Sequence, residues 1–256
     1  MTQTGSLFRV VIPARYASTR LPGKALLPMA GKPMIQWVWE RAGKSRAAEV
    51  IVATDDSRIA GAAKSFGATV AMTAATHPSG TDRIAEVARA RGWGPSDIVL
   101  NVQGDEPLIP PALIDQVAGL LEKNADADMA TLSVPLTRLE QLMDPNVVKV
   151  VMDSAGRALY FSRAPIPWQR DSAPAGLASQ TSFAGARRHI GIYAYRVGAL
   201  LRLASWPATP LEIAEKLEQL RALENGLRIR VADCVEPAGP DVNTPEDVER
   251  VLKHLL

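Results

Sequence analysis

The sequence predicts an α/β fold in which a mostly parallel sheet is flanked by helices. Short β-branched runs alternate with amphipathic segments of helical spacing as far as Lys123. Two of the helical segments are followed by a glycine, Gly67 and Gly92, which is a common way for a helix to end. Because strand–helix–strand units of this spacing form right-handed crossovers, the strands of this half are expected to run parallel.

Strands and helices alternate in order through the first half. The predicted strands are Leu7–Ile12, Glu49–Ala53, Ala68–Met72 and Asp97–Val102. The predicted helices are Pro33–Lys44, Asp56–Phe66, Thr81–Arg91 and Pro110–Lys123. Pro13 is expected to stop the first strand, and Pro33 lies in the first turn of its helix. Ligands bind beyond the carboxyl ends of such strands, so a site is expected in the loops that begin at Pro13, Thr54, Thr73 and Gln103.

The second half is richer in strands. Those predicted are Met129–Leu136, Val147–Asp153, Arg157–Ser162, His189–Arg196 and Leu227–Val235. One continuous amphipathic helix is predicted over Pro210–Glu224, capped by Asn225-Gly226, and a last helix over Thr244–Leu255 with a near capping box. The proline-containing segment Arg163–Arg188 is interpreted as a long functional loop or arm.

Composition excludes several classes of protein. The chain has 256 residues, a net charge of +2 and only 5% aromatic residues, which argues against a nucleic-acid-binding module. No run of 18 apolar residues exists, so no membrane insertion is expected, and the N-terminus lacks the pattern of a signal peptide. The one cysteine, Cys234, has no internal disulfide partner. We therefore expect a cytoplasmic protein with a sizeable core.

The loop Pro13–Lys24 (PARYASTRLPGK) is the first candidate for a binding site. It combines three basic residues with two hydroxyl residues and a glycine: Arg15, Arg20, Lys24, Ser18, Thr19 and Gly23. This combination suits a polyphosphate, although the loop matches neither the Walker A nor the GxGxxG pattern. The alternative is a solvated basic loop, which its position after the first strand makes less favourable.

Two acidic or amide-containing segments predict a metal site. Within NVQGDEP, a buried strand leads to Asp105, which is well placed to hold Mg²⁺ together with substrate phosphates. The alternative is that Asp105 or Glu106 caps the following helix. Asp241 and Asn243 lie at alternate positions before the last helix and would complete the metal site. Stabilisation of that helix by its dipole explains them equally well.

The remaining polar candidates are weaker. The helix start Ser79-Gly80-Thr81 offers backbone N–H groups to a base or phosphate, or is simply a cap. Arg163 suits a substrate carboxylate. His189 lies at a strand start beside two arginines, although a lone histidine is more often structural. Three further residues are interpreted without a chemical role: His77 and His254 at the surface, and Cys234 in the core.

A set of motifs in a fixed order resembles one known family. They are VIPARYASTRLPGK, GKPMI, VATD, SGTDR, NVQGDEP, YFSRAPIPW, RHIGIYAYR, LEQLR and NTPEDVERV, and they run from Val10 to about Leu252. The chain thereby resembles the 3-deoxy-manno-octulosonate cytidylyltransferases (CMP-KDO synthetases). The resemblance implies a Rossmann-like nucleotidyltransferase fold, Mg²⁺ dependence and a homodimer. It also implies the reaction of CTP with 3-deoxy-D-manno-octulosonate (KDO) to CMP-KDO and pyrophosphate, for lipopolysaccharide synthesis.

The resemblance implies a single nucleotidyltransferase domain over residues 1–256 with three parts. The nucleotide-binding part covers about 1–125, and a smaller β-rich part for sugar binding and dimerisation covers about 126–226. The C-terminal part, 227–256, carries the metal-site segment and the last helix.

The family's functional residues carry over by their motifs. Those implied to act in catalysis are Lys24, Asp105 and Arg15. The phosphates of CTP are assigned to Arg15, Ser18, Arg20 and Lys24. The cytidine pocket is assigned to Ala14, Thr54, Asp55, Ser79, Gly80 and Gln103. The sugar acid is assigned to Arg163, His189, Glu218 and Gln219. The metal is assigned to Asp105, Asn243 and Asp241.

One position departs from the family pattern. The family usually reads V-D-T-P-E-D, with the aspartate as second metal ligand, whereas this chain has Asn243 there. An amide oxygen still ligates Mg²⁺ but without charge, and Asp241 is a source of the missing charge. Two alternatives therefore stay open. One is a cytidylyltransferase for another acid sugar, such as 8-amino-KDO or a sialic acid, and the other is a non-catalytic CTP-binding relative.

Overall fold

The strands of the computed structural model, which describes residues 8–17, 21–173 and 175–255, fall in two sheets. The two-stranded sheet pairs β2 (Pro28–Met29) with β3 (Lys32–Pro33). The strands of the large sheet are β1 (Arg9–Ala14), β4 (Glu49–Thr54), β5 (Thr69–Met72), β6 (Ile98–Asn101), β7 (Met129–Pro135), β8 (Lys149–Met152), β9 (Ala158–Ser162), β10 (Arg187–Arg196) and β11 (Ile229–Asp233).

Helices connect most of these strands. The α-helices are α1 (Met34–Ala42), α2 (Ser57–Ser65), α3 (Gly80–Ala90), α4 (Pro111–Lys123), α5 (Leu139–Met143), α6 (Val197–Ser205), α7 (Pro210–Glu215), α8 (Gln219–Glu224) and α9 (Pro245–Leu255). Short 3₁₀ turns are η1 (Lys24–Leu26), η2 (Arg170–Ser172) and η3 (Leu177–Ser179). Within the described part of the chain, no helix is long and apolar enough to cross a membrane.

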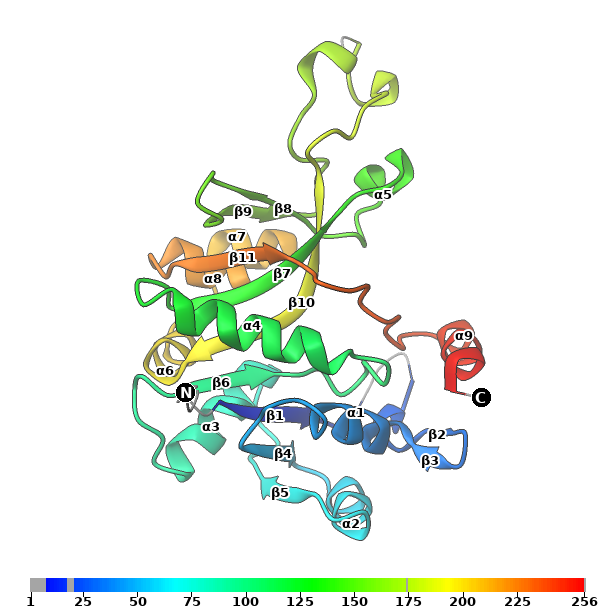
Figure 1. Cartoon of the computed structure of the whole chain (residues 1–256), viewed down its shortest axis with the longest axis vertical. Coiled ribbons are helices and arrows are strands. Elements are labelled where there is room, and N and C mark those ends of the chain that lie inside the picture. The colour runs from blue at the N-terminus through cyan, green and yellow to red at the C-terminus, as the bar shows by residue number, and fades with distance from the viewer. Residues whose placement is uncertain (1–7, 18–20, 174, 256) are drawn as a thin grey trace, which may run out of the picture.

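The large sheet is mainly parallel, as the sequence predicts (Figure 1). Its order is β11–β7–β10–β6–β1–β4–β5, and β8 and β9 extend it from β10. Along that path only β10 runs against the others, and it joins the two halves of the chain by pairing with both β6 and β7. One sheet therefore carries the site loops of the first half and the β-rich second half.

Helices cover both faces of this sheet. Helices α1, α2 and α4 pack on one face against residues such as Val10, Ile12 and Leu100. Helices α3, α6 and α8 pack on the other, against residues such as Val11 and Val99. Both side-chain sets of β1 and β6 are thus buried, as expected of a strand in the middle of a parallel sheet.

Three predicted features of the elements need correction. Pro13 does not stop β1, which continues to Ala14 along β4. Pairing with β6 ends at Val11, so the missing N–H of Pro13 lies where β1 has only one neighbour. The predicted single helix over 210–224 is two helices, α7 and α8, because Lys216 adopts a left-handed conformation with φ of 54°. Helices α5 and α6 were not predicted; α6 follows β10 without an intervening turn signal.

The segment between β9 and β10, residues 163–186, stands away from the sheet (Figure 1). Among its described residues, the only regular elements are the short 3₁₀ turns η2 and η3. We call this segment the arm. Its projecting loop structure agrees with the prediction of a long loop or arm over Arg163–Arg188.

The C-terminal helix brings a distant part of the chain to the first β–α loop. Val242 and Val251 pack with Met29 and Met34, so α9 lies against α1 and the β2–β3 hairpin. Asp247 accepts the backbone N–H groups of Asn243 and Thr244 at 2.8 and 2.9 Å, which fixes the start of α9. This packing holds Asn243 near Lys24.

Candidate active site

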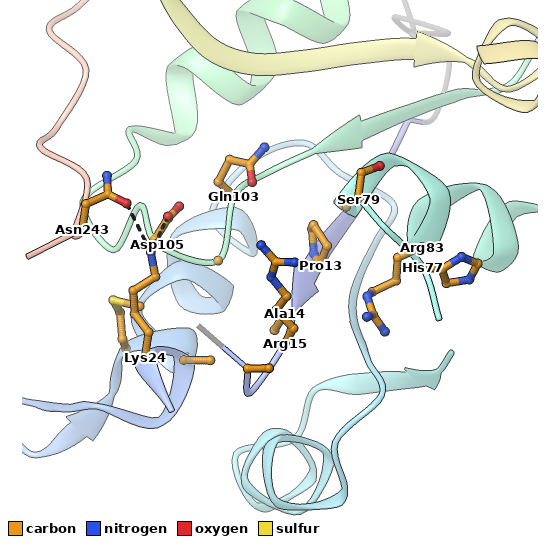
Figure 2. A pocket seen from close by; sticks show the side chains of 15 residues that line it. Pro13, Ala14, Arg15, Lys24, His77, Ser79, Arg83, Gln103, Asp105 and Asn243 are labelled. Atoms are coloured by element: carbon orange, nitrogen blue, oxygen red, sulfur yellow. Dashed lines mark hydrogen bonds and ion pairs between the residues drawn. The ribbon is translucent and has the colours of Figure 1, made fainter. Parts of the chain in front are cut away.

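A cavity of about 310 Å³ opens at the carboxyl ends of β1 and β6 and the start of α3, the edge that the topology predicts (Figure 2). We call it the first cavity. It is lined by Pro13, Ala14, Arg15, Ala17, Lys24, Ala25, Met34, His77, Ser79, Gly80, Arg83, Gln103, Gly104, Asp105 and Asn243. A Cβ atom at Gly104 would lie 3.0 Å from the Pro13 carbonyl oxygen, so the absence of a side chain lets this loop pass close to β1 without a shift of the backbone.

Lys24, Asp105 and Asn243 meet at one end of the first cavity (Figure 2). The Lys24 ammonium donates to Asp105 Oδ2 at 2.7 Å, to the Val242 carbonyl at 2.9 Å and to Asn243 Oδ1 at 3.4 Å. Three oxygens from two distant segments therefore converge on one positive charge. Two of these oxygens, Asp105 Oδ2 and Asn243 Oδ1, belong to predicted metal ligands.

The residues present fit Mg²⁺ better than a cation held by protein alone. The described residues contain no group of three or more His, Cys, Asp or Glu side chains arranged for a metal. Mg²⁺ is typically held by one or two carboxylates together with substrate phosphates. Asp105 and the Asn243 amide oxygen fit that pattern. Asp241 lies behind them, where its Oδ2 accepts from Asn243 Nδ2 at 2.5 Å and so turns the amide oxygen toward Lys24.

Glu106 faces the interior instead of the cavity. Its Oε2 is buried without a hydrogen-bond partner among the described residues. Burial, and then the neighbouring Asp105, raise the pKa of Glu106 to about 8. The carboxylate that Lys24 contacts is that of Asp105. The capping alternative is not supported, because the N-cap of α4 is Pro110 and no side chain caps it.

The opposite wall of the first cavity is formed by the start of α3. Ser79 is the N-cap and accepts from the Asp82 N–H at 3.3 Å, as the capping alternative predicted. A side chain at Gly80 would lie 3.0 Å from Pro13 Cγ, so α3 starts in close contact with the end of β1. Ser79 and Gly80 nevertheless both line the cavity, together with the exposed Arg15.

Two predicted cytidine residues do not reach the cavity. Thr54 is fully buried at the end of β4, where its hydroxyl accepts from the Asp56 N–H at 3.2 Å. Asp55 lies behind Arg83, at 3.2 Å from its guanidinium, and Arg83 is the residue that lines the cavity. Two predicted phosphate residues, Ser18 and Arg20, lie outside the described residues.

His77 was predicted to be a surface residue, but it lines the first cavity (Figure 2). Its Nε2 contacts the Glu86 carboxylate, which also accepts from the Ala74 N–H at 2.9 Å. The Ala74 N–H, and then His77, lower the pKa of Glu86 despite its partial burial. The position of His77 just before Ser79-Gly80, at the end of a β–α loop, was the signal in the sequence.

A second cavity, of about 280 Å³, adjoins the first and shares Gly80 and Gln103 with it. Its other lining residues are Thr81, Asn101, Met129, Val148, His189, Gly191, Tyr193, Tyr195, Leu203, Leu217, Glu218 and Gln219. The structure therefore brings together three of the predicted sugar residues, His189, Glu218 and Gln219. Tyr193 and Tyr195 were missed, although the alternating pattern of RHIGIYAYR places them on the same face of β10.

The second cavity suits a ligand rich in hydroxyl groups. Asn101 Oδ1 and the Tyr193 hydroxyl are buried without hydrogen-bond partners among the described residues. A buried polar group without a hydrogen bond lowers the stability of the fold unless a ligand or a water molecule supplies that hydrogen bond. Glu218 contacts the Thr81 hydroxyl directly in the cavity lining, and burial raises the pKa of the Glu218 carboxyl group.

Arg163 does not line either cavity. Its Nε donates to the Glu215 carbonyl at 2.7 Å, and its NH1 donates to the Pro145 carbonyl at 2.8 Å. The guanidinium is held by these two carbonyl groups at the end of β9.

His189 is expected to make stability fall in mild acid. Burial, and then Arg188, lower its pKa to about 3, and its Nε2 lies 2.9 Å from the Thr131 hydroxyl. An unfolded histidine takes up its proton near pH 6.5, so stability is complete above that pH and decreases as pH falls toward 3. Between pH 7.5 and 5.5 the free energy of unfolding should fall by about 1 kcal/mol more than in His189→Gln.

Urea denaturation at the two pH values measures this difference directly. Equal losses in both proteins would show that the folded protein accepts the proton on His189.

Comparisons with known proteins agree with this geometry. Residues 9–229 match the cytidylyltransferase family. The 3-deoxy-manno-octulosonate cytidylyltransferase of Thioalkalivibrio sulfidiphilus is 56% identical over 248 residues, covering 97% of this chain and 98% of the relative. That of Pseudomonas fluorescens is 56% identical over 250 residues, with 98% of each chain covered.

This chain belongs to the 3-deoxy-manno-octulosonate cytidylyltransferase family. The resemblance that its motifs indicated is thereby confirmed, and the chain is a nucleotidyltransferase. A solved structure described as CMP:2-keto-3-deoxy-manno-octonic acid synthetase complexed with CTP shares the fold, with a TM-score of 0.87, 41% identity and 98% of each chain covered. A 4-diphosphocytidyl-2C-methyl-D-erythritol synthase structure, 12% identical with a TM-score of 0.65, shares the fold alone.

Proposed function

We propose that this protein transfers CMP from CTP to KDO, releases pyrophosphate and thereby activates the sugar for lipopolysaccharide synthesis. The observation that carries the proposal is the pair of joined cavities. The first cavity is lined by basic side chains and by carboxylate and amide oxygens that could ligate a metal. The second is lined by buried polar groups that have no hydrogen-bond partner among the described residues. Gln103 and Gly80 lie where the two cavities meet, which is where the reacting groups of two substrates would be brought together.

The chemistry needs charge neutralisation more than covalent help. The anomeric hydroxyl of the sugar attacks the α-phosphorus in line, and pyrophosphate leaves. Arg15 and Lys24 offset the negative charge of the triphosphate, and Ser79 with Gly80 and Ala14 form the wall beside the nucleoside. His189, Glu218 and Gln219 bind the sugar acid in the second cavity.

Nucleotidyltransferases typically use a divalent metal, and we propose Mg²⁺, held by Asp105 and Asn243. When bound, it supplies further neutralisation of phosphate charge. Asp241 keeps the Asn243 oxygen turned toward the site through its hydrogen bond to the amide nitrogen.

We further propose a cytoplasmic homodimer that uses the second half of the chain. The arm exposes Trp168 and Leu177, which are 46% and 49% exposed, and large apolar side chains on a projecting segment suit a protein interface. In this proposal the whole chain is one domain, with nucleotide-binding, sugar-binding and C-terminal metal-site parts.

The proposal is tested by pyrophosphate release from the purified protein with CTP and Mg²⁺, with and without KDO. Release that requires all three components is expected. Release with 8-amino-KDO or a sialic acid instead of KDO would keep the mechanism and change the substrate. CTP binding without release from any sugar would favour a non-catalytic relative.

Replacing Asn243 by aspartate is expected to lower the Mg²⁺ concentration that gives half-maximal activity. The added carboxylate would face the same point as Asp105 and raise the affinity for a divalent cation by about tenfold. A Mg²⁺ titration of pyrophosphate release measures the change, with Asn243→Ala as the variant expected to shift in the opposite direction. An unchanged Mg²⁺ requirement in both variants would remove Asn243 from the metal site.

A further inference from the structure

The break between α7 and α8 is a feature that the catalytic site does not by itself explain. Helix α7 ends at Glu215, and Lys216 adopts the left-handed conformation with φ of 54° and ψ of 46°. For a residue other than glycine this conformation is strained, so it persists only where neighbouring contacts fix it. The amphipathic pattern of the sequence would otherwise continue one helix through this point.

Glu215 supplies contacts that fix the break. Its Oε1 accepts from the Ser162 hydroxyl at 2.6 Å, and its Oε2 accepts from the Arg163 N–H at 2.8 Å. Its backbone carbonyl accepts from Arg163 Nε at 2.7 Å. Both ends of Glu215 are therefore bound to two consecutive residues, at the point where β9 ends and the arm begins.

A buried positive charge, that of Lys149, interacts with the Glu215 charge. The Lys149 side chain is fully buried and donates to the carbonyl groups of Arg163 and Asp144, at 2.6 and 2.9 Å. Burial lowers the pKa of Lys149, and the charges of Asp144 and Glu215 oppose that effect. The Tyr160 hydroxyl lies 3.5 Å from Glu215 Oε1. Glu215 thus joins β8, β9 and the base of the arm in one polar cluster.

The residues directly after the break form a wall of the second cavity. Leu217, Glu218 and Gln219 all line it, whereas Glu215 lines neither cavity. Without the turn at Lys216, a continuous helix would present these side chains in other directions, since successive helical residues are rotated by about 100°. Glu215 is therefore joined through a single turn to the side chains that line the second cavity.

We propose that Glu215 is a positioning residue for the acid sugar. It holds the turn between α7 and α8 so that Glu218 and Gln219 face the second cavity, and it ties this wall to the first residue of the arm. The inference rests on the proposed function for the identity of the sugar, but the coupling itself does not depend on that identity.

The test is Glu215→Gln, which keeps the size of the side chain but loses its charge and one of its two acceptor oxygens. We expect the KM for KDO to rise about tenfold, as for the loss of a hydrogen bond to a charged group. The KM for CTP should change less than about twofold, because the first cavity does not contain this wall.

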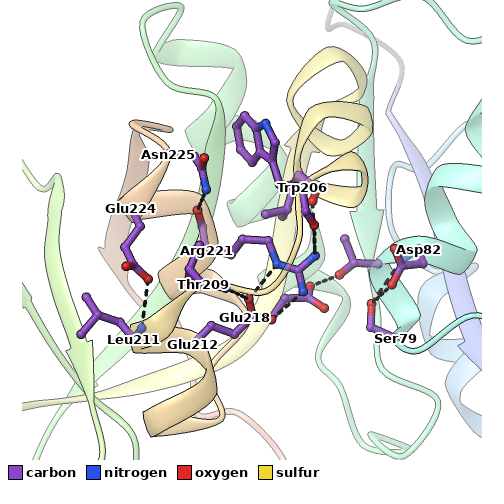
Figure 3. A network of polar contacts seen from close by, with 12 residues as sticks. Ser79, Asp82, Trp206, Thr209, Leu211, Glu212, Glu218, Arg221, Glu224 and Asn225 are labelled. Carbon is purple, nitrogen blue, oxygen red and sulfur yellow. Dashed lines mark hydrogen bonds and ion pairs between the residues drawn. The ribbon is translucent and has the colours of Figure 1, made fainter.

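Glu212→Gln is the matched control, because Glu212 lies on the same helix. Its carboxylate binds the Arg221 guanidinium at 2.8 and 2.5 Å, in a network that braces α7 against α8 and the Trp206 carbonyl (Figure 3). We expect this variant to melt at a lower temperature with an unchanged KM for KDO. Equal rises in the two KM values of Glu215→Gln, or a lower melting temperature with neither changed, would overturn the proposal.

Hydrogen exchange gives a measurement that does not require turnover. In Glu215→Gln the amides of residues 216–219 and of Ala164 should exchange faster together, whereas in Glu212→Gln the increase should stay within residues 209–214 and around its partner Arg221. If the unmodified protein releases no pyrophosphate with KDO, the proposed function fails while this exchange pattern still decides the role of Glu215. Unchanged exchange at residues 216–219 in Glu215→Gln would overturn it.

Discussion

Replacing Asp105 by asparagine is expected to reduce kcat about 1000-fold, equivalent to about 4 kcal/mol in activation free energy. Asp105 is the carboxylate that meets Lys24 and Asn243 in the first cavity, while the neighbouring Glu106 has a raised pKa and faces the interior. Asparagine keeps the shape of the side chain but removes the charge that a divalent cation needs. Steady-state pyrophosphate release with saturating CTP, KDO and Mg²⁺ measures the loss.

Asp241→Asn is the matched control for this prediction. Asp241 is exposed and contacts the Asn243 amide instead of facing the cavity, so its loss of charge should reduce kcat by less than about fivefold. Thermal melting should show both variants folded, because the Asp105 side chain is 26% exposed. Near-normal turnover of Asp105→Asn would remove Asp105 from the metal site, and an equally large loss in Asp241→Asn would make Asp241 a ligand.

The parallel half of the fold was predictable because its signals are local. Strands such as β6 are short, β-branched and fully buried, and helices such as α2 and α3 end beside glycines with positive φ, Gly67 and Gly92. These patterns depend on neighbouring residues only. The loops at the carboxyl ends of the strands then place the first cavity where the sequence predicts it.

The errors arise where contacts between distant segments decide the structure. No local pattern distinguishes Lys216 from a helical residue, and its conformation accompanies the contacts of Glu215 with Ser162 and Arg163. Arg163 suits a carboxylate by its chemistry, but two backbone carbonyls hold it instead. His77 looks like a surface residue until α3 and its loop are folded against β1.

The candidate site divides in the same way. The motifs assign Asp105 and Asn243 to the metal and Lys24 to the phosphates. The structure supplies the reason for the proximity of the three residues, which is the packing of Val242 and of Val251 on α9 against Met29 and Met34. The tyrosines of β10 needed only the alternation of a strand to be found. Thr54 and Asp55, which the motifs assign to the cytidine pocket, line neither cavity, because Thr54 is buried at the end of β4 and Asp55 pairs with Arg83.

Replacing Lys24 by alanine is expected to lower kcat/KM for CTP by at least about 100-fold, while the KM for KDO changes much less. The Lys24 side chain is only 18% exposed, and its ammonium is fixed by Asp105, Val242 and Asn243 at the edge of the first cavity. The variant loses a positive charge that offsets the triphosphate and leaves Asp105 without its partner. Initial rates over a range of CTP concentrations measure the effect.

Two roles of Lys24 need to be separated, because it also connects the C-terminal segment to the first cavity. If it mainly holds that segment through its ammonium hydrogen bonds, Lys24→Ala should melt at a lower temperature, and Val242→Ala, which loosens the same segment without removing a charge, should lower kcat/KM for CTP by a similar factor. If its charge acts on the phosphates, Val242→Ala should retain most of the activity that Lys24→Ala loses. Lys32→Ala is the control, because Lys32 lies on β3, forms an ion pair with Glu40 at 2.8 Å and lines neither cavity. Its kcat/KM for CTP should therefore be retained. A change confined to the KM for KDO would contradict the phosphate role, since Lys24 lines the first cavity and not the second.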